Sequence, residues 1–115
     1  MKYVLFVVLI GSVVGPELYQ PAGAVEVNPN VASAGELYRK NCASCHGKDG
    51  RAKTFKAKFN KARDISDATW HESVSDERVF NSIMNGRGKK MPAYSKKLSV
   101  QEIESLVSFV RSLRR

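Results

Sequence analysis

The stretch that decides the fold is a run of six residues in the first half of the chain, Asn41-Cys42-Ala43-Ser44-Cys45-His46. It contains both cysteines of the protein, three positions apart, and a histidine directly follows the second. This spacing is the motif for c-type haem attachment. Thiols at this spacing reach the two vinyl groups of a porphyrin, and the adjacent histidine can place a ring nitrogen on the iron. The motif therefore predicts one covalently bound haem c, held by Cys42, Cys45 and His46.

Three other functions of the cysteine pair fit the sequence less well. A redox disulfide of the thioredoxin type expects a βαβ setting, which the pattern of the chain does not provide. A structural zinc ion needs four ligands, and His71 is the only other cysteine or histidine in the chain. A single small disulfide is open to any exported protein with two cysteines. Haem attachment is preferred because the motif, the expected fold class and the expected export all agree with it.

The first 24 residues have the pattern of a secretory signal peptide. Lys2 provides a positive start, residues 4–14 are almost entirely apolar, and Ala22-Gly23-Ala24 supplies the small residues that a signal peptidase needs. The apolar run is much shorter than the ~20 residues that cross a bilayer. We therefore expect residues 1–24 to be cleaved and residues 25–115 to form one exported domain, in the periplasm or otherwise outside the cytoplasm.

The pattern that surrounds the motif is helical. The capping box Ser-x-x-Glu occurs at residues 33–36 and again at 99–102, and it predicts a helix towards Asn41 and a longer one through Leu113. A third helix is expected over residues 76–85. Three arginines in the last turn of the final helix suit the negative end of its dipole, namely Arg111, Arg114 and Arg115. No stretch alternates convincingly at period two, so the sequence predicts an all-α fold of three to four helices with long loops.

With these features in place, the chain resembles the small monohaem class I cytochromes c of bacteria over residues 32–113. The blocks that carry the resemblance are Cys42-Ala43-Ser44-Cys45-His46, Arg63-Asp64-Ile65 leading to Trp70, Asn85-Gly86-Arg87-Gly88-Lys89-Lys90-Met91-Pro92-Ala93-Tyr94 and Leu98-Ser99-Val100-Gln101-Glu102-Ile103. The resemblance implies the class I cytochrome c fold, with haem between the terminal helices and one haem edge at the surface. It also implies that His46 and Met91 are the axial iron ligands and that the indole of Trp70 approaches a haem propionate.

The residues themselves support the choice of Met91 as the second axial ligand. The candidates on the far side of a haem are Met84, Met91 and His71. Met91 lies in a glycine-bounded loop that can carry a side chain across the ring, and Pro92 fixes the backbone after it. Met84 falls on the apolar face of the helix expected at 76–85, where it is a core residue. His71 ranks second, although a surface or hydrogen-bonded histidine is its more ordinary role.

The ligand set predicts the class of function. Histidine and methionine together fill both axial positions of an iron, leave no site for a substrate, and favour one-electron transfer. We therefore expect an electron carrier of the periplasm rather than an enzyme. One alternative is a haem subunit held permanently in a larger redox complex. Another is a haem enzyme or gas-binding protein with an open sixth position, which requires Met91 to lie off the iron.

The positive charge indicates which partners to expect. The formal net charge is +8, with seven basic residues against one acidic residue over 47–63, and five basic residues over 86–97. Both segments flank the expected iron ligands, so they predict a positive docking face for acidic patches on redox partner proteins. The expected export argues against a nucleic-acid partner. The alternative is that the lysines keep the protein soluble or hold it near an anionic membrane surface.

Overall fold

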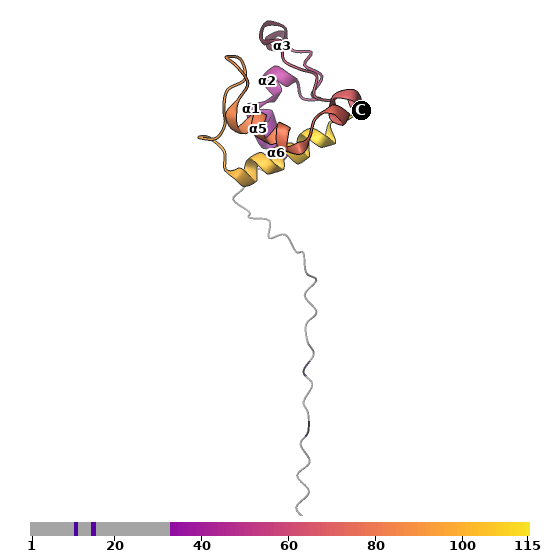
Figure 1. The fold of residues 1–115 in the computed structure, drawn as a ribbon, viewed down its shortest axis with the longest axis vertical. Coiled ribbons are helices and arrows are strands. Elements are labelled where there is room, and N and C mark those ends of the chain that lie inside the picture. The colour runs from indigo at the N-terminus through magenta and orange to yellow at the C-terminus, as the bar shows by residue number, and fades with distance from the viewer. Residues whose placement is uncertain (1–10, 12–14, 16–32) are drawn as a thin grey trace, which may run out of the picture.

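The computed structural model describes Gly11, Gly15 and residues 33–115. Six helices follow one another along residues 33–115: α1 (Ala34–Asn41), α2 (Ala43–His46), α3 (Phe55–Asn60), α4 (Ala68–Ser73), α5 (Asp76–Asn85) and α6 (Val100–Ser112). The only β-type pairing in the described part of the chain is an isolated bridge between Arg87 and Met91. The expected all-α fold class is confirmed (Figure 1).

The three longest helices are those expected from the sequence. Both capping boxes form: Ser33 accepts from the backbone N–H of Glu36, and Ser99 accepts from that of Glu102. In each box the glutamate side chain also accepts from the backbone of its serine, so two otherwise unpaired N–H groups are satisfied at each start. Helix α5 spans the expected residues and ends where Gly86 takes a positive φ of 72°.

Three short helices, α2, α3 and α4, lie in stretches that the sequence analysis treats as motif or loop. Each has only four to six residues, which is too short for apolar periodicity to show. Two of them carry a recognisable start. The side chains of Thr54 and Asp67 accept hydrogen bonds from the N–H groups of Ala57 and Trp70 respectively. The capping residue was thus the only local signal for α3 and α4, and α2 has no side-chain cap.

The core is built where α1 and α5 pack on α6. Its buried apolar residues are Leu37, Tyr38, Ile65, Val79, Ile83, Ile103, Leu106, Val107 and Val110. The rings of Tyr38 and Phe109 lie 4.9 Å apart between centroids, and a Cβ at Gly35 would meet Phe109 at 3.5 Å. A small residue on α1 therefore lets an aromatic residue of α6 come close, and the two helices cross tightly.

The arginines at the end of α6 do more than face the helix dipole. Each makes an ion pair with the segment of residues 64–76, at 2.6 to 2.8 Å; their partners are Asp76 for Arg111, Glu72 for Arg114 and Asp64 for Arg115. We call these three residues the arginine strap. Arg111 also donates to the backbone carbonyls of His71 and Val74. The strap ties the segment before and through α4 to the C-terminal helix.

The expected signal peptide falls outside the described residues except at Gly11 and Gly15, and its cleavage site stays a prediction. Within the part of the chain that the structure describes, none of the helices combines the length and the apolar character that a membrane crossing requires.

Candidate functional site

A cavity of about 630 Å³ opens between the α1–α2 segment, helices α4 and α5, the loop after α5, and α6. All five residues that the sequence singles out for a cofactor line this one cavity: Cys42, Cys45, His46, Trp70 and Met91. They come from three segments separated by more than twenty residues each. The fold therefore brings the predicted site residues together.

The cysteine side of the cavity is formed by the junction of α1 and α2. The backbone N–H of Cys42 donates to the carbonyl of Tyr38 at 2.8 Å, and that of His46 donates to the carbonyl of Cys42 at 2.9 Å. The chain thus continues almost helically through the motif and presents both sulfurs and the imidazole within little more than one turn. Cys42 and Cys45 are not joined in a disulfide. Burial, followed by the nearby Cys45, raises the pKa of the Cys42 thiol to about 11, so it is protonated at neutral pH.

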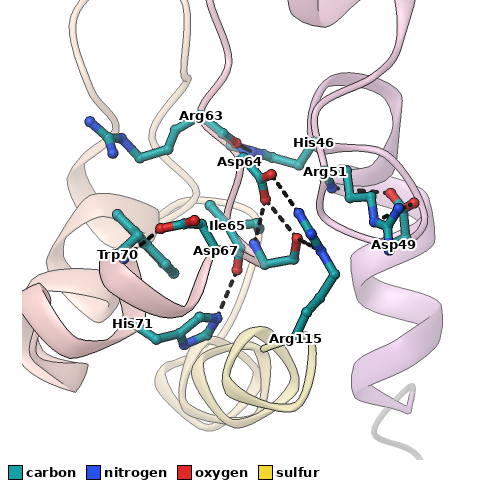
Figure 2. Close-up of polar contacts among 11 residues, drawn as sticks. His46, Asp49, Arg51, Arg63, Asp64, Ile65, Asp67, Trp70, His71 and Arg115 are labelled. Atoms are coloured by element: carbon teal, nitrogen blue, oxygen red, sulfur yellow. Dashed lines mark hydrogen bonds and ion pairs between the residues drawn. The ribbon is translucent and has the colours of Figure 1, made fainter.

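His46 is oriented by a backbone carbonyl. Its ring lies beside the backbone of Arg63 (Figure 2), and Nδ1 is 3.0 Å from the carbonyl oxygen of that residue. A carbonyl can only accept, so Nδ1 donates, and in the neutral ring this leaves the lone pair on Nε2. Within the described residues Nε2 makes no hydrogen bond. An imidazole that donates through one nitrogen and keeps the other unprotonated is prepared to ligate a metal.

The carbonyl that orients His46 belongs to a segment that is itself held in place. Asp64 accepts from the N–H and the hydroxyl of Ser66, at 2.8 and 2.6 Å, and from the guanidinium of Arg115 at 2.8 Å. Partial burial acts to raise the pKa of Asp64, but these hydrogen bonds and the Arg115 charge outweigh it and hold the pKa below its usual value. The end of the arginine strap therefore lies one residue from the group that fixes His46 (Figure 2).

Met91 lies on a loop that depends on backbone geometry rather than on a helix. The N–H of Arg87 donates to the carbonyl of Met91 at 2.9 Å, and the reverse bond is 3.3 Å long. Gly86 packs under this turn, where an added Cβ would lie 2.6 Å from the Met91 carbonyl oxygen. After the turn, Tyr94 donates its N–H to Ile83 at 3.0 Å. Its hydroxyl donates to the carbonyl of Asn41 at 2.8 Å, which joins the loop to the start of the cysteine motif.

The two competing ligands are engaged elsewhere. Met84 packs against the core and is absent from the lining of the cavity. His71 is buried, with Nε2 2.9 Å from the carbonyl of Ile65 and Nδ1 3.2 Å from the guanidinium of Arg111. Because the guanidinium can only donate, Nδ1 accepts and Nε2 donates. Both ring nitrogens of His71 therefore serve the packing of α4 on α6, the ordinary role considered for it above.

Trp70 lies between the contact of α4 with α6 and the cavity. Its ring meets that of His71 edge to face, with 4.9 Å between centroids, and part of it lines the cavity. No hydrogen bond from its indole N–H to a described residue is present, so that donor is available to an acceptor in the cavity.

Sequence reasoning missed two contributions to the site. Arg78 on α5 lines the cavity beside four cations that the basic segments had already indicated, which are Lys61, Arg63, Arg87 and Lys90. Nothing in the sequence marked Arg78 for the site, because it lies outside both basic segments. The carbonyl of Arg63 could not have been found, because a backbone group has no side-chain signal.

The comparisons with known proteins agree with this geometry. The protein family described as "Cytochrome C oxidase, cbb3-type, subunit III" matches residues 29–110. Among curated proteins, the cbb3-type cytochrome c oxidase subunit FixP of Rhizobium meliloti is 30% identical over 114 residues, which is 90% of this chain and 37% of the relative. Subunit CcoP of Rhodobacter capsulatus is 31% identical over 102 residues, 82% of this chain and 31% of the relative. The chain thus spans well under half the length of these curated relatives.

A solved structure gives the same result for the fold. The KustC0563 c-type cytochrome is 33% identical and superposes with a TM-score of 0.69, covering 73% of this chain and 100% of that one. A mutant form of the same cytochrome gives a TM-score of 0.67 at 32% identity. The resemblance to small class I cytochromes c is therefore confirmed, and the chain belongs to the c-type cytochrome family described as cbb3-type cytochrome c oxidase subunit III.

Proposed function

We propose that the cavity binds a single haem c and that the chain passes single electrons as a haem subunit of a larger redox complex. One observation carries the proposal for the site: a single cavity gathers Cys42, Cys45, His46 and Met91 from two distant segments. Membership of a c-type cytochrome family supports haem c and electron transfer independently of that geometry.

The residues present fit haem c in size and in chemistry. A volume of about 630 Å³ is typical of a site for a bound cofactor. Apolar side chains suited to a porphyrin ring, among them Ile83, Leu106 and Val110, form part of its wall. Cations line it as well, including Arg78 and Lys61, and they suit the two carboxylates of a haem.

The chain holds the group through four side chains. The sulfur of each cysteine would bond to a vinyl carbon, and the thiol hydrogen would pass to the neighbouring carbon. His46 would ligate the iron through Nε2, and the bond from Nδ1 to Arg63 fixes that orientation. Met91 would supply a second iron ligand, and the Trp70 indole would donate to a propionate. When bound, haem c supplies an iron that gains and loses one electron.

A His/Met ligand pair also limits what the protein can do. If His46 and Met91 both ligate the iron, the protein would leave no position for oxygen, peroxide or a substrate, and the soft thioether would favour ferrous iron. The proposed domain is therefore an electron-transfer unit and does not itself carry out catalysis. The haem enzyme or gas-binding alternative would require Met91 to leave the iron.

The curated relatives favour the complex over the free periplasmic carrier that the sequence analysis expects first. Both FixP and CcoP are named as subunits of cbb3-type cytochrome c oxidase. Since this chain matches only a part of each, the identity of its own complex is a proposal. We place the haem domain outside the cytoplasm, because the pattern of residues 1–24 predicts export.

The free carrier remains the second candidate, and one observation favours it. The chain covers the whole of the small KustC0563 c-type cytochrome, so the described domain corresponds to the full length of that chain. The two candidates predict different behaviour on purification from native membranes. A permanent subunit stays with a larger haem-containing assembly after mild detergent extraction and size-exclusion chromatography, whereas a free carrier is recovered alone from the soluble exported fraction.

The ligand assignment is tested on holoprotein made in a host that matures cytochromes c. Acidified acetone should fail to extract the colour, and the mass should exceed that of the polypeptide by one haem. In the ferric protein the weak long-wavelength band of iron–methionine ligation is expected. Met91→Ala should abolish that band, lower the reduction potential and open the ferrous iron to carbon monoxide.

Met84→Leu is the matched control, because it conserves the volume of a methionine that packs on the core outside the cavity. Its spectrum and carbon monoxide response should equal those of the wild type. The opposite pattern, with Met84→Leu affecting the iron and Met91→Ala silent, would overturn the assignment. Two free thiols in the purified protein would overturn the haem proposal altogether.

A further inference from the structure

Helix α3 carries two largely exposed aromatic side chains that pack on each other at the surface. Phe55 and Phe59 lie four residues apart, their ring centroids are 4.8 Å apart, and they are 78% and 66% exposed. Figure 1 shows α3 at the end of the domain opposite α6. We call these two residues the phenylalanine pair. A contiguous pair of large apolar side chains this exposed is a candidate for a protein interaction site.

The pair is not needed to hold α3 in place. Ala57, on the other side of the helix, is buried, and the hydroxyl of Thr54 donates to the carbonyls of Ser44 and Cys45 at 2.9 and 3.1 Å. From across the cavity, the ammonium of Lys90 donates to the carbonyl of Phe59 at 2.8 Å. The aromatic rings are therefore presented on a helix that is already anchored to both sides of the haem site.

The phenylalanine pair also lies next to the electron-transfer site. Asn60 follows Phe59 directly, lines the cavity and donates its amide to the sulfur of Cys45 at 3.7 Å. Lys61 lines the same cavity. A protein that covers the pair thus comes within a few residues of the proposed thioether edge of the haem.

The charge around the pair is of one sign. Residues 50–63 contain six cations and no acidic residue, and Lys56 and Lys58 alternate with the two aromatic positions along the helix. The nearest acid before this stretch, Asp49, is paired with Arg51 at 3.6 Å. A complementary surface would therefore present an apolar hollow for two rings, rimmed by carboxylates.

We propose that the phenylalanine pair is the apolar centre of the surface on which a redox partner protein docks, with the lysines of α3 as its charged rim. The inference rests on the electron-transfer function proposed above and specifies the partner for that site. A protein is favoured over a membrane, because interfacial helices bury a long apolar face whereas α3 has six residues and one aromatic pair. Two rigid aromatic anchors inside a charged rim are typical of protein interfaces.

The test compares the double variant Phe55→Ser/Phe59→Ser with a matched apolar-to-polar control, Val100→Ser, at the exposed start of α6. The reduced holoproteins are mixed with membranes of the native host from which this gene has been deleted, and haem oxidation is followed by stopped flow. The double variant should reduce the second-order rate about tenfold, both at low and at high salt, because the lost contact is apolar. Val100→Ser should match the wild type, and all three proteins should keep the same spectrum and potential.

A charge variant distinguishes the contribution of the α3 lysines to docking from that of the phenylalanine pair. Lys56→Glu/Lys58→Glu should slow the reaction at low ionic strength and approach the wild type at high ionic strength, because salt screens steering by exposed charges. A double phenylalanine variant that reacts as fast as the wild type would overturn the docking inference and leave the electron-transfer proposal intact. A wild-type protein that the membranes fail to oxidise would overturn both.

The membrane alternative has its own outcome. Wild-type holoprotein and the double phenylalanine variant are sedimented with phosphatidylcholine vesicles, with and without phosphatidylserine. We expect no difference between them. Loss of vesicle binding in the double variant, together with an unchanged rate towards the detergent-solubilised oxidising complex, would assign the pair to a lipid surface and overturn the protein-docking proposal.

Discussion

The two segments that supply the proposed iron ligands are built in different ways. Residues 42–46 continue the backbone hydrogen bonding of α1, so the chain positions both cysteines and the histidine by local bonds of helical type. Residues 86–94 form no helix, and Met91 is held by one pair of backbone bonds to Arg87 and by the close packing of Gly86. The cysteine segment should tolerate substitutions, because several successive helical hydrogen bonds hold its backbone. The Met91 loop depends on a few backbone contacts.

This difference in construction predicts which features of the site a substitution in each segment should affect. The hydroxyl of Tyr94 bonds to the carbonyl of Asn41 and is a direct polar link between the Met91 loop and the cysteine motif. Loss of the loop should therefore change the iron coordination and leave covalent attachment intact. Loss of the cysteines should remove the covalent anchor while the loop keeps its own backbone bonds.

The largest effect is expected when the cysteine side is removed. In Cys42→Ala/Cys45→Ala no thioether can form, and acidified acetone should extract all the haem that the protein still carries. Cys45→Ala alone should keep a covalent haem through the half-buried Cys42. Mass spectrometry of the denatured polypeptide checks both results, and one haem mass on the double variant would contradict the assignment of the attachment site.

The second-largest effect is expected when the packing of the Met91 loop is disturbed. Gly86→Ala places a methyl group 2.6 Å from the Met91 carbonyl oxygen at a φ of 72°, so both a clash and backbone strain oppose the turn. We expect the holoprotein to lose about 3 kcal/mol of unfolding free energy. The iron–methionine band should weaken as well, while the haem stays covalently bound.

Gly88→Ala is the control for this change. Gly88 also has a positive φ, 57°, but no atom lies within 4 Å of an added Cβ. Only the left-handed backbone then opposes the methyl group, at about 1 kcal/mol. Denaturant unfolding followed through the haem absorption measures both variants. Equal losses for the two glycines would show that packing under the Met91 turn is unimportant.

The same difference explains what the sequence could predict. The motif at 42–46, the capping boxes and the helix at 76–85 are local patterns, and each is present in the structure as expected. Met91 was ranked above Met84 because one lies in a glycine-bounded loop and the other on an apolar helix face; Met91 lines the cavity and Met84 does not. Contiguous residues were sufficient for these features.

Other features depend on contacts between distant residues. The arginine strap joins the end of α6 to residues 64–76, and from the sequence its members are recognisable only as cations at a helix end. The hydrogen bond from His46 to the Arg63 carbonyl spans 17 residues and ends on a backbone atom. Helix α3 is too short to show an apolar periodicity in the sequence, and its segment was expected to be a basic loop. The exposed aromatic pair on one face of α3 therefore could not be predicted.

A moderate effect is expected for the two tyrosines that brace the site. The Tyr38 hydroxyl donates to the carbonyl of Gly47 at 2.7 Å in a buried position, whereas the Tyr94 bond to Asn41 is only partly buried. Tyr38→Phe removes the shorter of the two hydrogen bonds that the Gly47 carbonyl accepts, the other coming from the N–H of Gly50 at 3.2 Å, and should cost about 1 kcal/mol of unfolding free energy. Tyr94→Phe should cost less, yet it should disturb the iron–methionine band more, because it frees the loop.

The pH dependence distinguishes the buried tyrosine further. Burial raises the pKa of Tyr38 above its ordinary value of about 10. Below that value both the folded and unfolded states hold the proton. As the pH rises above it, the unfolded state releases the proton first and stability falls. Urea unfolding of the holoprotein between neutral and strongly basic pH should show this loss in the wild type and a smaller one in Tyr38→Phe.

The smallest effect is expected for substitutions that change how firmly His46 is oriented. Asp64→Asn removes the negative charge that pairs with Arg115. Asp64 directly follows Arg63, whose carbonyl orients His46, so this change should loosen the orientation of the imidazole. Glu72→Gln is the matched control, because it breaks another exposed ion pair of the arginine strap away from that carbonyl. Each should cost no more than about 1 kcal/mol of stability. Only Asp64→Asn should shift the reduction potential and the haem spectrum.

The pH dependence of this pair follows from the lowered pKa of Asp64. Because the folded state holds the carboxylate more strongly than the unfolded state, the pair stabilises the protein above the ordinary carboxyl pKa of about 3.9. That contribution disappears as the pH falls through the lower folded value. The difference between wild type and Asp64→Asn should therefore be constant near neutrality and vanish in strong acid. A potential that shifts equally in Asp64→Asn and Glu72→Gln would show that the strap acts only on packing, and that the Arg63 carbonyl keeps its place without Asp64.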